Sequence, residues 1–144
     1  MSKIVDILFR RIFLFLILFT VNSFLLSSQE IQNSSSIWYF GDRAGLDFNN
    51  FPPTSLTDGQ LNTQEGVASI SNSLGELLFY TDGKTVWDRT HQPMPNANGN
   101  LNGHFSSTQS AIIIPHQGAA NQYYIFTTDQ QGGNSGLSYS IRNE

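Results

Sequence analysis

The stretch GELLFYTDGKTVWD, residues 75–88, places an unbroken apolar run before an Asp-Gly pair and a second short apolar run after it. A hairpin lying on a single core would alternate apolar and polar residues, because successive side chains of a strand point to opposite faces. The residues from Leu77 to Tyr80 do not alternate. The run therefore predicts a strand that is covered on both faces, and Asp82-Gly83 predicts a tight hairpin turn with positive backbone angles.

The same order of elements occurs twice along the chain. Residues 66–88 and residues 109–142 each show strand, turn, strand, Thr-Asp and strand, with Ile70 matching Ile113 and Asp82 matching Asp129. A repeat of roughly 45 residues made only of short strands is typical of β-propeller blades, in which each sheet lies between two neighbours. A β-sandwich also has short strands, but it leaves one face of each sheet wet and so predicts alternation in AIII and YYIF.

We therefore predict an all-β fold for residues 37–144. It would comprise about two blades of a WD40/YVTN-like β-propeller, with a leading strand pair at 37–48, a first blade at 66–88 and a second at 109–142. Closed propellers use about four to eight blades, so we expect an incomplete fragment that is followed by further blades of the same full-length chain.

The first 28 residues have the pattern of a secretory signal peptide. Positive charges at Lys3, Arg10 and Arg11 precede the apolar run IFLFLILF at 12–19, and small and polar residues follow it. A membrane anchor is the alternative, but polar residues interrupt the run before it reaches the roughly 20 apolar residues of a spanning helix. Cleavage could follow Ser23 or Ser28, and the polar residues 29–36 would then form a flexible leader.

Charge and composition disfavour some classes of binding partner and some kinds of site. The chain has a net charge of −4, and three of its seven basic residues belong to the predicted signal peptide. An acidic mature chain disfavours nucleic acid and anionic membranes. It has no cysteine, so neither disulfides nor thiolate zinc sites are available.

The order of motifs also resembles a known group of proteins. The resemblance is to the N-terminal propeller-like region of large secreted proteins of gliding bacteria, which are cell-surface molecules ending in a gliding-motility-associated, type IX secretion sorting domain. It implies export and surface display, and it brings no established catalytic residues. The motifs that carry it are IWYFGDRAGLDFN, GELLFYTDGKTVWD, HQPMPN, SSTQSAIIIP, YYIFTTD and GLSYSI. No sorting domain is present in this sequence.

Residues with catalytic or metal-binding chemistry do not form a recognisable motif. The three histidines are not at zinc-ligand spacing, and the acidic pair in GDRAGLDFNN lacks the pattern of a calcium loop. Paired carboxylates could serve a glycosidase, but two of the four candidates occupy the same repeat position before a turn, as structural Asx-turn residues do. The residues considered are His91, His104, His116, Asp42, Asp47, Glu65, Asp82, Asp88 and Asp129.

Hydroxyl and aromatic residues are assigned structural roles as well. The segment SSTQS, Ser106 to Ser110, has no nucleophile elbow, so its hydroxyls are expected to cap turns. Trp38 and Trp87 could stack on sugars, but Trp87 and Tyr139 fall at roughly the same repeat position, which favours packing between blades.

The sequence thus predicts a non-catalytic, exported cell-surface module for adhesion or interaction, with no catalytic residue, cofactor or metal. Its ligand, a surface protein or a glycan, stays open. A secreted hydrolase that acts on polysaccharide through propeller-borne carboxylates is the alternative function.

Overall fold

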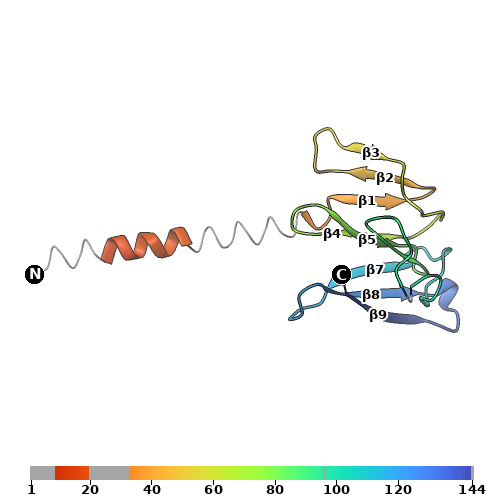
Figure 1. The fold of residues 1–144 in the computed structure, drawn as a ribbon. Coiled ribbons are helices and arrows are strands. Elements are labelled where there is room, and N and C mark those ends of the chain that lie inside the picture. The colour runs from red at the N-terminus through yellow and green to blue at the C-terminus, as the bar shows by residue number, and fades with distance from the viewer. Residues whose placement is uncertain (1–8, 20–32, 96, 144) are drawn as a thin grey trace, which may run out of the picture.

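The computed structural model describes residues 9–19, 33–95 and 97–143. The chain is mostly β, as the sequence predicts, and its strands form three small antiparallel sheets, none of them closed (Figure 1). A short 3-10 helix, η1 (Gln130–Gly132), joins the last two strands. The strands are β1 (Ile37–Phe40), β2 (Ala44–Asp47), β3 (Thr54–Leu56), β4 (Ala68–Ser71), β5 (Leu77–Thr81), β6 (Val86–Asp88), β7 (Ala111–Pro115), β8 (Gln122–Thr128) and β9 (Leu137–Asn143).

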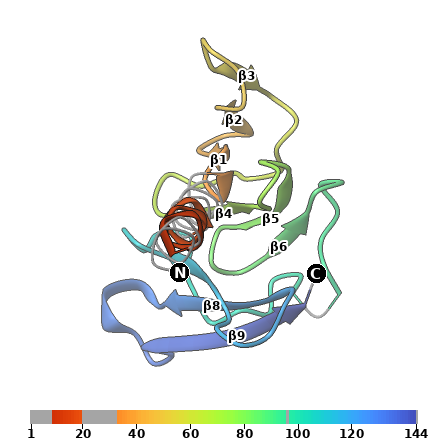
Figure 2. The same cartoon turned by 90° about the vertical axis from the view of Figure 1, so that its left-hand side faces the viewer.

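Each sheet is a three-stranded meander of consecutive strands. We call β1–β3 the first sheet, β4–β6 the second and β7–β9 the third. The sheets meet through their first strands, because β4 contacts both β1 and β7. Figure 2 shows β1 beside β4 and β3 at the far end of the first sheet. The second sheet is therefore the middle one.

The middle strand β5 is covered on both faces, which confirms the prediction from its unbroken apolar run. Phe79 and Tyr80 are 1% and 0% exposed. Tyr80 belongs to a cluster with Tyr39 and Leu61 on the side of the first sheet. Phe79 packs with Ile125 on the side of the third sheet. Because adjacent residues of a strand point to opposite faces, a strand between two sheets needs apolar residues at every position.

The third sheet is covered on one face only, so the prediction that AIII and YYIF are covered on both is wrong. Ala111 and Ile125 are buried against the second sheet, whereas Ile112 is 48% and Tyr139 is 64% exposed. Among the described residues, no further sheet packs on this face. The strand register also corrects one match of the repeat. Phe79 and Phe126 each lie three residues before the matched aspartates, and they pair with Ile70 and Ile112. Ile112, not Ile113, is therefore the counterpart of Ile70.

The turn after β5 is longer than a two-residue hairpin. Thr81 pairs with Val86, which leaves residues 82–85 as the connection. Gly83 has the predicted positive φ, +88°, but Asp82 does not. The Asp82 carboxylate instead accepts hydrogen bonds from the backbone N–H groups of Lys84 and Thr85, both at 2.8 Å, and this Asx-type arrangement sets the wider turn.

Two parts of the fold lie outside the predicted strands. β3 extends the leading strand pair at 37–48 into a three-stranded sheet. The long connection after β6 returns along the free edge of that strand, where Val86 donates to the Ala97 carbonyl (2.9 Å) and accepts from Met94 N–H (2.8 Å). Ala97 and Leu101 from this connection are buried in the main core.

The last four residues of the predicted flexible leader contact the sheets. Of the residues predicted as a flexible leader, 33–36 are held by hydrogen bonds, including Ser71 N–H to the Ser34 carbonyl (2.9 Å) and Phe48 N–H to the Ser36 carbonyl (2.8 Å). The predicted cleavage sites and residues 29–32 lie outside the described residues.

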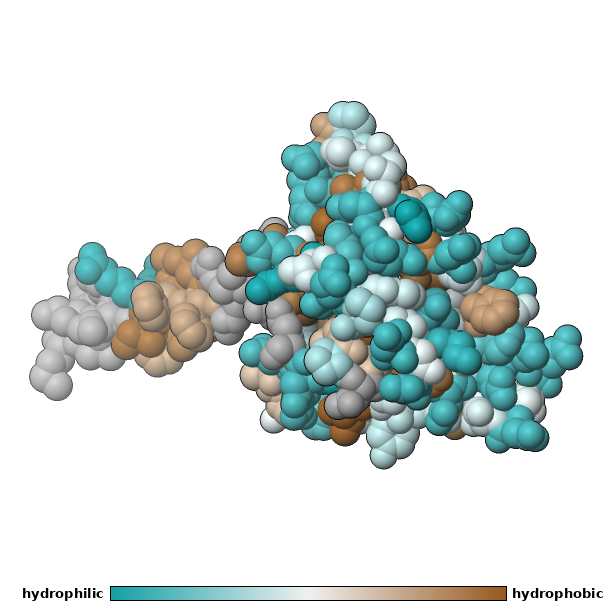
Figure 3. All heavy atoms as spheres, turned by 45° about the vertical axis from the view of Figure 1, so that its right-hand side comes forward, coloured by the Kyte–Doolittle hydropathy of each residue, from teal (hydrophilic) through white to brown (hydrophobic). Residues whose placement is uncertain are grey.

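Residues 9–19 of the predicted signal peptide form a helix with exposed apolar side chains, coloured brown in Figure 3 beside a mostly hydrophilic face of the sheets. In the part of the chain that the structure describes, no helix has the length and apolar character needed to span a membrane.

Candidate functional site

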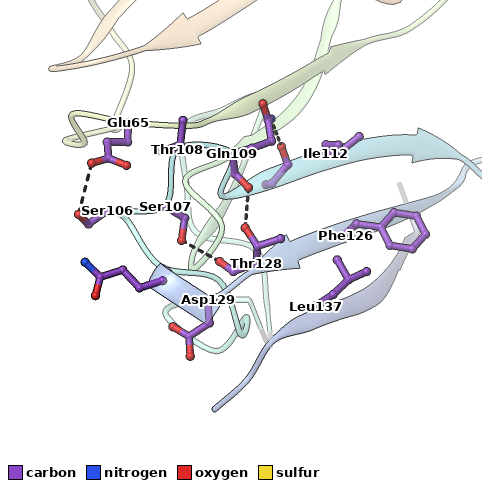
Figure 4. Close-up of a pocket in the computed structure, with 12 residues that line it drawn as sticks. Glu65, Ser106, Ser107, Thr108, Gln109, Ile112, Phe126, Thr128, Asp129 and Leu137 are labelled. Carbon is purple, nitrogen blue, oxygen red and sulfur yellow. Dashed lines mark hydrogen bonds between the residues drawn. The ribbon is translucent and has the colours of Figure 1, made fainter. Parts of the chain in front are cut away.

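A cleft of about 570 Å³ lies at one end of the third sheet (Figure 4). The end of this sheet supplies an apolar wall from Ile112, Phe126 and Leu137. Residues before β7 and at the end of β8 and beyond it, together with Glu65, supply the polar wall. These are Glu65, Ser106, Ser107, Thr108, Gln109, Thr128, Asp129 and Gln131.

Hydroxyl groups fix the polar wall to the sheet. Ser107 Oγ donates to the Thr128 carbonyl (3.0 Å), and Thr128 Oγ1 donates to the Gln109 carbonyl (2.6 Å). Gln109 Nε2 in turn donates to the Ala111 carbonyl (2.9 Å). These bonds tie the loop before β7 to the end of β8, so Ser107 has the structural role predicted for the SSTQS segment.

The two acidic residues of the cleft differ in availability. Asp129 Oδ1 accepts from Gln130 N–H (2.8 Å) and its Oδ2 accepts from Ser135 N–H (3.2 Å), and these two backbone bonds hold the pKa of its carboxyl below the usual value. Glu65 makes only a long contact, 3.4 Å from Oε1 to Ser106 Oγ. Glu65 is therefore the carboxylate that a ligand in this cleft could engage.

The other candidate carboxylates also serve the backbone. Asp82 caps its own turn, as described above. Asp88 Oδ1 accepts from the Thr90 N–H (2.8 Å) and from the Gln92 N–H (3.0 Å). Partial burial raises the pKa of Asp88, but hydrogen bonds from Thr90 and Gln92 outweigh it and bring the pKa below the usual value. The Asx-turn prediction is confirmed for Asp82. Asp129 also bonds its own turn backbone, but through the N–H groups one and six residues ahead, which is not an Asx-turn.

A second polar cluster joins the first two sheets and was not predicted. Tyr39 Oη donates to Asp58 Oδ1 (2.8 Å), and His91 Nε2 lies 3.3 Å from Asp58 Oδ2. His91 Nδ1 lies 3.0 Å from Tyr80 Oη, which also accepts from the Gln60 N–H. The hydrogen bond from Tyr39 lowers the pKa of Asp58. Burial, followed by the bond to Asp58, raises the pKa of Tyr39.

The aromatic rings of this cluster pack closely. The Tyr80 ring stacks on Tyr39 at 4.7 Å and on Trp87 at 5.5 Å between centroids, and its side chain is 0% exposed, so no substrate can reach its hydroxyl. The polar group missed by sequence reasoning is Asp58. Its only sequence signal is the Asp-Gly pair that it forms with Gly59.

The remaining histidines lie apart from this cluster. His104 stacks on Phe105 at 4.3 Å, and His116 stacks on Tyr124 at 4.7 Å. Within the described ranges, no three His, Asp or Glu side chains come together as a metal site. Of the acidic pair considered for calcium, Asp47 Oδ1 accepts from Asn49 N–H (2.8 Å), and Asp42 forms a β-bridge with Asn62.

The candidate aromatic residues occupy three different settings. Trp87 pairs with Tyr80, whereas Tyr139 pairs with Phe126, so these two residues are not at equivalent positions as the sequence suggested. Trp38 packs against Phe48 at 5.0 Å on the outer face of the first sheet, and its side chain is 49% exposed. Trp87 is thus a packing residue, while Trp38 and Tyr139 present aromatic surface to solvent.

No protein-family model, curated protein or solved structure matches this chain.

Proposed function

We propose that this chain is an exported, non-catalytic binding module that belongs to a β-propeller displayed at the cell surface. It would take a glycan or a surface protein at the cleft of the third sheet. The mixed lining of this cleft, with an apolar wall facing amides and a carboxylate, is the kind of surface that binding sites use.

The observation that carries the non-catalytic proposal is how the two carboxylates of the cleft, Asp129 and Glu65, are hydrogen-bonded. A glycoside hydrolase of the usual kind needs two carboxyl groups flanking the scissile bond, one to protonate the leaving group and one to act as nucleophile or base. Both oxygens of Asp129 are used by backbone N–H groups, which leaves Glu65 alone. One available acid supports binding better than it supports hydrolysis.

The propeller part of the proposal rests on the repeated plan of the sheets. Three consecutive meanders follow one another along the chain, each meeting the next through its first strand. In the second and third sheets, an aspartate directly after the middle strand accepts hydrogen bonds from backbone N–H groups of the connection that follows. Export rests on the charged and apolar halves of residues 1–28, and display rests on the motif resemblance.

A screen for both binding and turnover tests the proposal. The purified chain is titrated with a panel of polysaccharides and surface proteins, and released reducing ends are measured in parallel. We expect saturable binding without turnover, and we expect Glu65→Gln to weaken the binding. Glu76→Gln is the matched control, because Glu76 lies in an exposed turn outside the cleft.

The alternative hydrolase function predicts a different result. Reproducible release of sugar that Glu65→Gln abolishes and Glu76→Gln leaves intact would overturn the non-catalytic proposal.

A further inference from the structure

The stack of three sheets ends in two open apolar faces. We call the outer face of the third sheet the β8 face; its exposed members are Ile112 (48%), Ile114 (45%), Leu137 (73%), Tyr139 (64%) and Ile141 (48%). We call the outer face of the first sheet the β1 face; its exposed members are Trp38 (49%), Phe40 (38%) and Phe48 (42%). Soluble proteins rarely leave apolar clusters of this kind uncovered.

The molecule itself shows what covers such a face. Counting back three residues from Asp82 and from Asp129 gives Phe79 and Phe126, so these residues occupy equivalent positions. Phe79 is 1% exposed, because the third sheet covers it and the Tyr123 ring meets it edge-on at 5.3 Å. The β8 face, which carries Phe126, is thus the same kind of surface as one already buried by a sheet in this chain.

The β1 face supplies the other half of such a junction. The second sheet uses its Tyr80 face toward the preceding sheet and its opposite face, with Phe79, toward the following one. The first sheet uses its Tyr39 face toward the second sheet, where Tyr39 stacks on Tyr80. Its opposite face, with Trp38 and Phe48, is free to meet a preceding sheet.

We propose that the β8 face of one copy of this chain packs on the β1 face of another copy, so that the stack continues from molecule to molecule. Joining two different faces makes the association heterologous, and it can continue beyond a dimer. The strand residues of both faces are uncharged, so the junction buries no unpaired charge.

The proposed junction also involves the cleft. Ile112, Phe126 and Leu137 belong both to the β8 face and to the apolar wall of the cleft. A docked copy would close this wall and leave the polar wall, with Glu65 and Gln131, at the rim. Association and ligand binding at the cleft would therefore influence each other.

Complementary variants test the direction of the junction. The mass of the full chain is measured by light scattering over a range of concentrations, with Tyr139→Glu to charge the β8 face and Trp38→Glu to charge the β1 face. We expect the wild type to associate and each variant to lose roughly tenfold or more in association. Mixing the two variants should give a one-to-one dimer, because each retains the face that the other has lost.

Controls separate this junction from other causes of association. Leu74→Glu charges a 75% exposed leucine in the turn after β4 and should associate like the wild type. Helix 9–19 is the same in every variant, so association through it cannot produce the complementary pattern. Circular dichroism checks each fold, and Ile141→Lys replaces Tyr139→Glu if that variant is unfolded.

Three results would overturn the proposal. A wild-type chain that is monomeric at all concentrations has no such junction. Wild-type behaviour of Trp38→Glu combined with loss in Tyr139→Glu would indicate two β8 faces meeting each other. Loss of association in both variants without recovery on mixing would show that the two faces do not pair.

Discussion

Replacing Gly83 by alanine should destabilise the fold well beyond the cost of its backbone angle. Gly83 has φ +88°, which residues with a Cβ atom rarely adopt. A Cβ atom added there would lie 2.8 Å from the Ser110 carbonyl oxygen and 2.9 Å from Ser110 Cβ. That carbonyl is fixed, because it accepts the Thr128 N–H at 3.1 Å. The turn after β5 and the start of β7 would have to move apart.

Gly118 provides a matched control for the backbone angle. Its φ is +90°, nearly the same as that of Gly83, and no atom lies within 4 Å of a Cβ added there. Gly118→Ala should therefore cost only the left-handed conformation, about 1–2 kcal/mol. Gly83→Ala adds the forced contact, for which overpacking costs of about 1–3 kcal/mol apply. We expect the two variants to differ by about 1–3 kcal/mol.

Urea unfolding followed by tryptophan fluorescence measures this difference. The midpoint of the Gly83→Ala transition should fall clearly below that of Gly118→Ala, at an unchanged slope. Gly83→Val should be at least as destabilised as Gly83→Ala. Equal midpoints for the two alanine variants would refute the close approach of Gly83 to Ser110.

Three further predictions concern the buried phenol, the capped turn and the leader. Burial raises the pKa of Tyr80 to about 12, so the protonated phenol should contribute fully to stability below about pH 10, and this contribution should be lost as the pH rises towards 12. Fluorescence follows the unfolding, and absorbance of the phenolate follows the titration. Tyr80→Phe should remove this part of the loss of stability at alkaline pH. Asp82→Ala leaves the N–H groups of Lys84 and Thr85 without their acceptor and should lower the free energy of unfolding by about 1 kcal/mol in urea titrations, whereas no change would mean that water replaces the carboxylate. The exported protein should begin between Phe24 and Glu30, and N-terminal sequencing that finds Met1 or Ser2 would contradict the signal peptide.

The sequence predicts best where one residue pattern has one physical cause. The run from Leu77 to Tyr80 predicts a strand covered on both faces, since both faces of this strand carry apolar side chains. Asp82 and Asp129 predict turn caps, because a repeated short carboxylate after a strand most often bonds its own backbone. The contacts confirm these predictions.

The sequence predicts less well where distant segments decide the outcome. AIII and YYIF resemble the buried run, but whether a second sheet covers them depends on partners that the pattern does not encode. β3 was missed because its three residues follow two prolines and include a single large apolar side chain. Asp58 was missed because its two partners, Tyr39 and His91, come from separate positions in the sequence that only the packed sheets bring together.

The way in which the three sheets contact one another has a consequence for the cooperativity of unfolding. Only the second sheet touches both others through its first strand, so stability is shared along a line of neighbours, as in repeat proteins. A substitution that loosens β5 weakens two junctions at once. A substitution that loosens the third sheet leaves the aromatic junction of Tyr39 and Tyr80 in place, so partial opening of this chain should begin at its outer sheets and reach the middle one last.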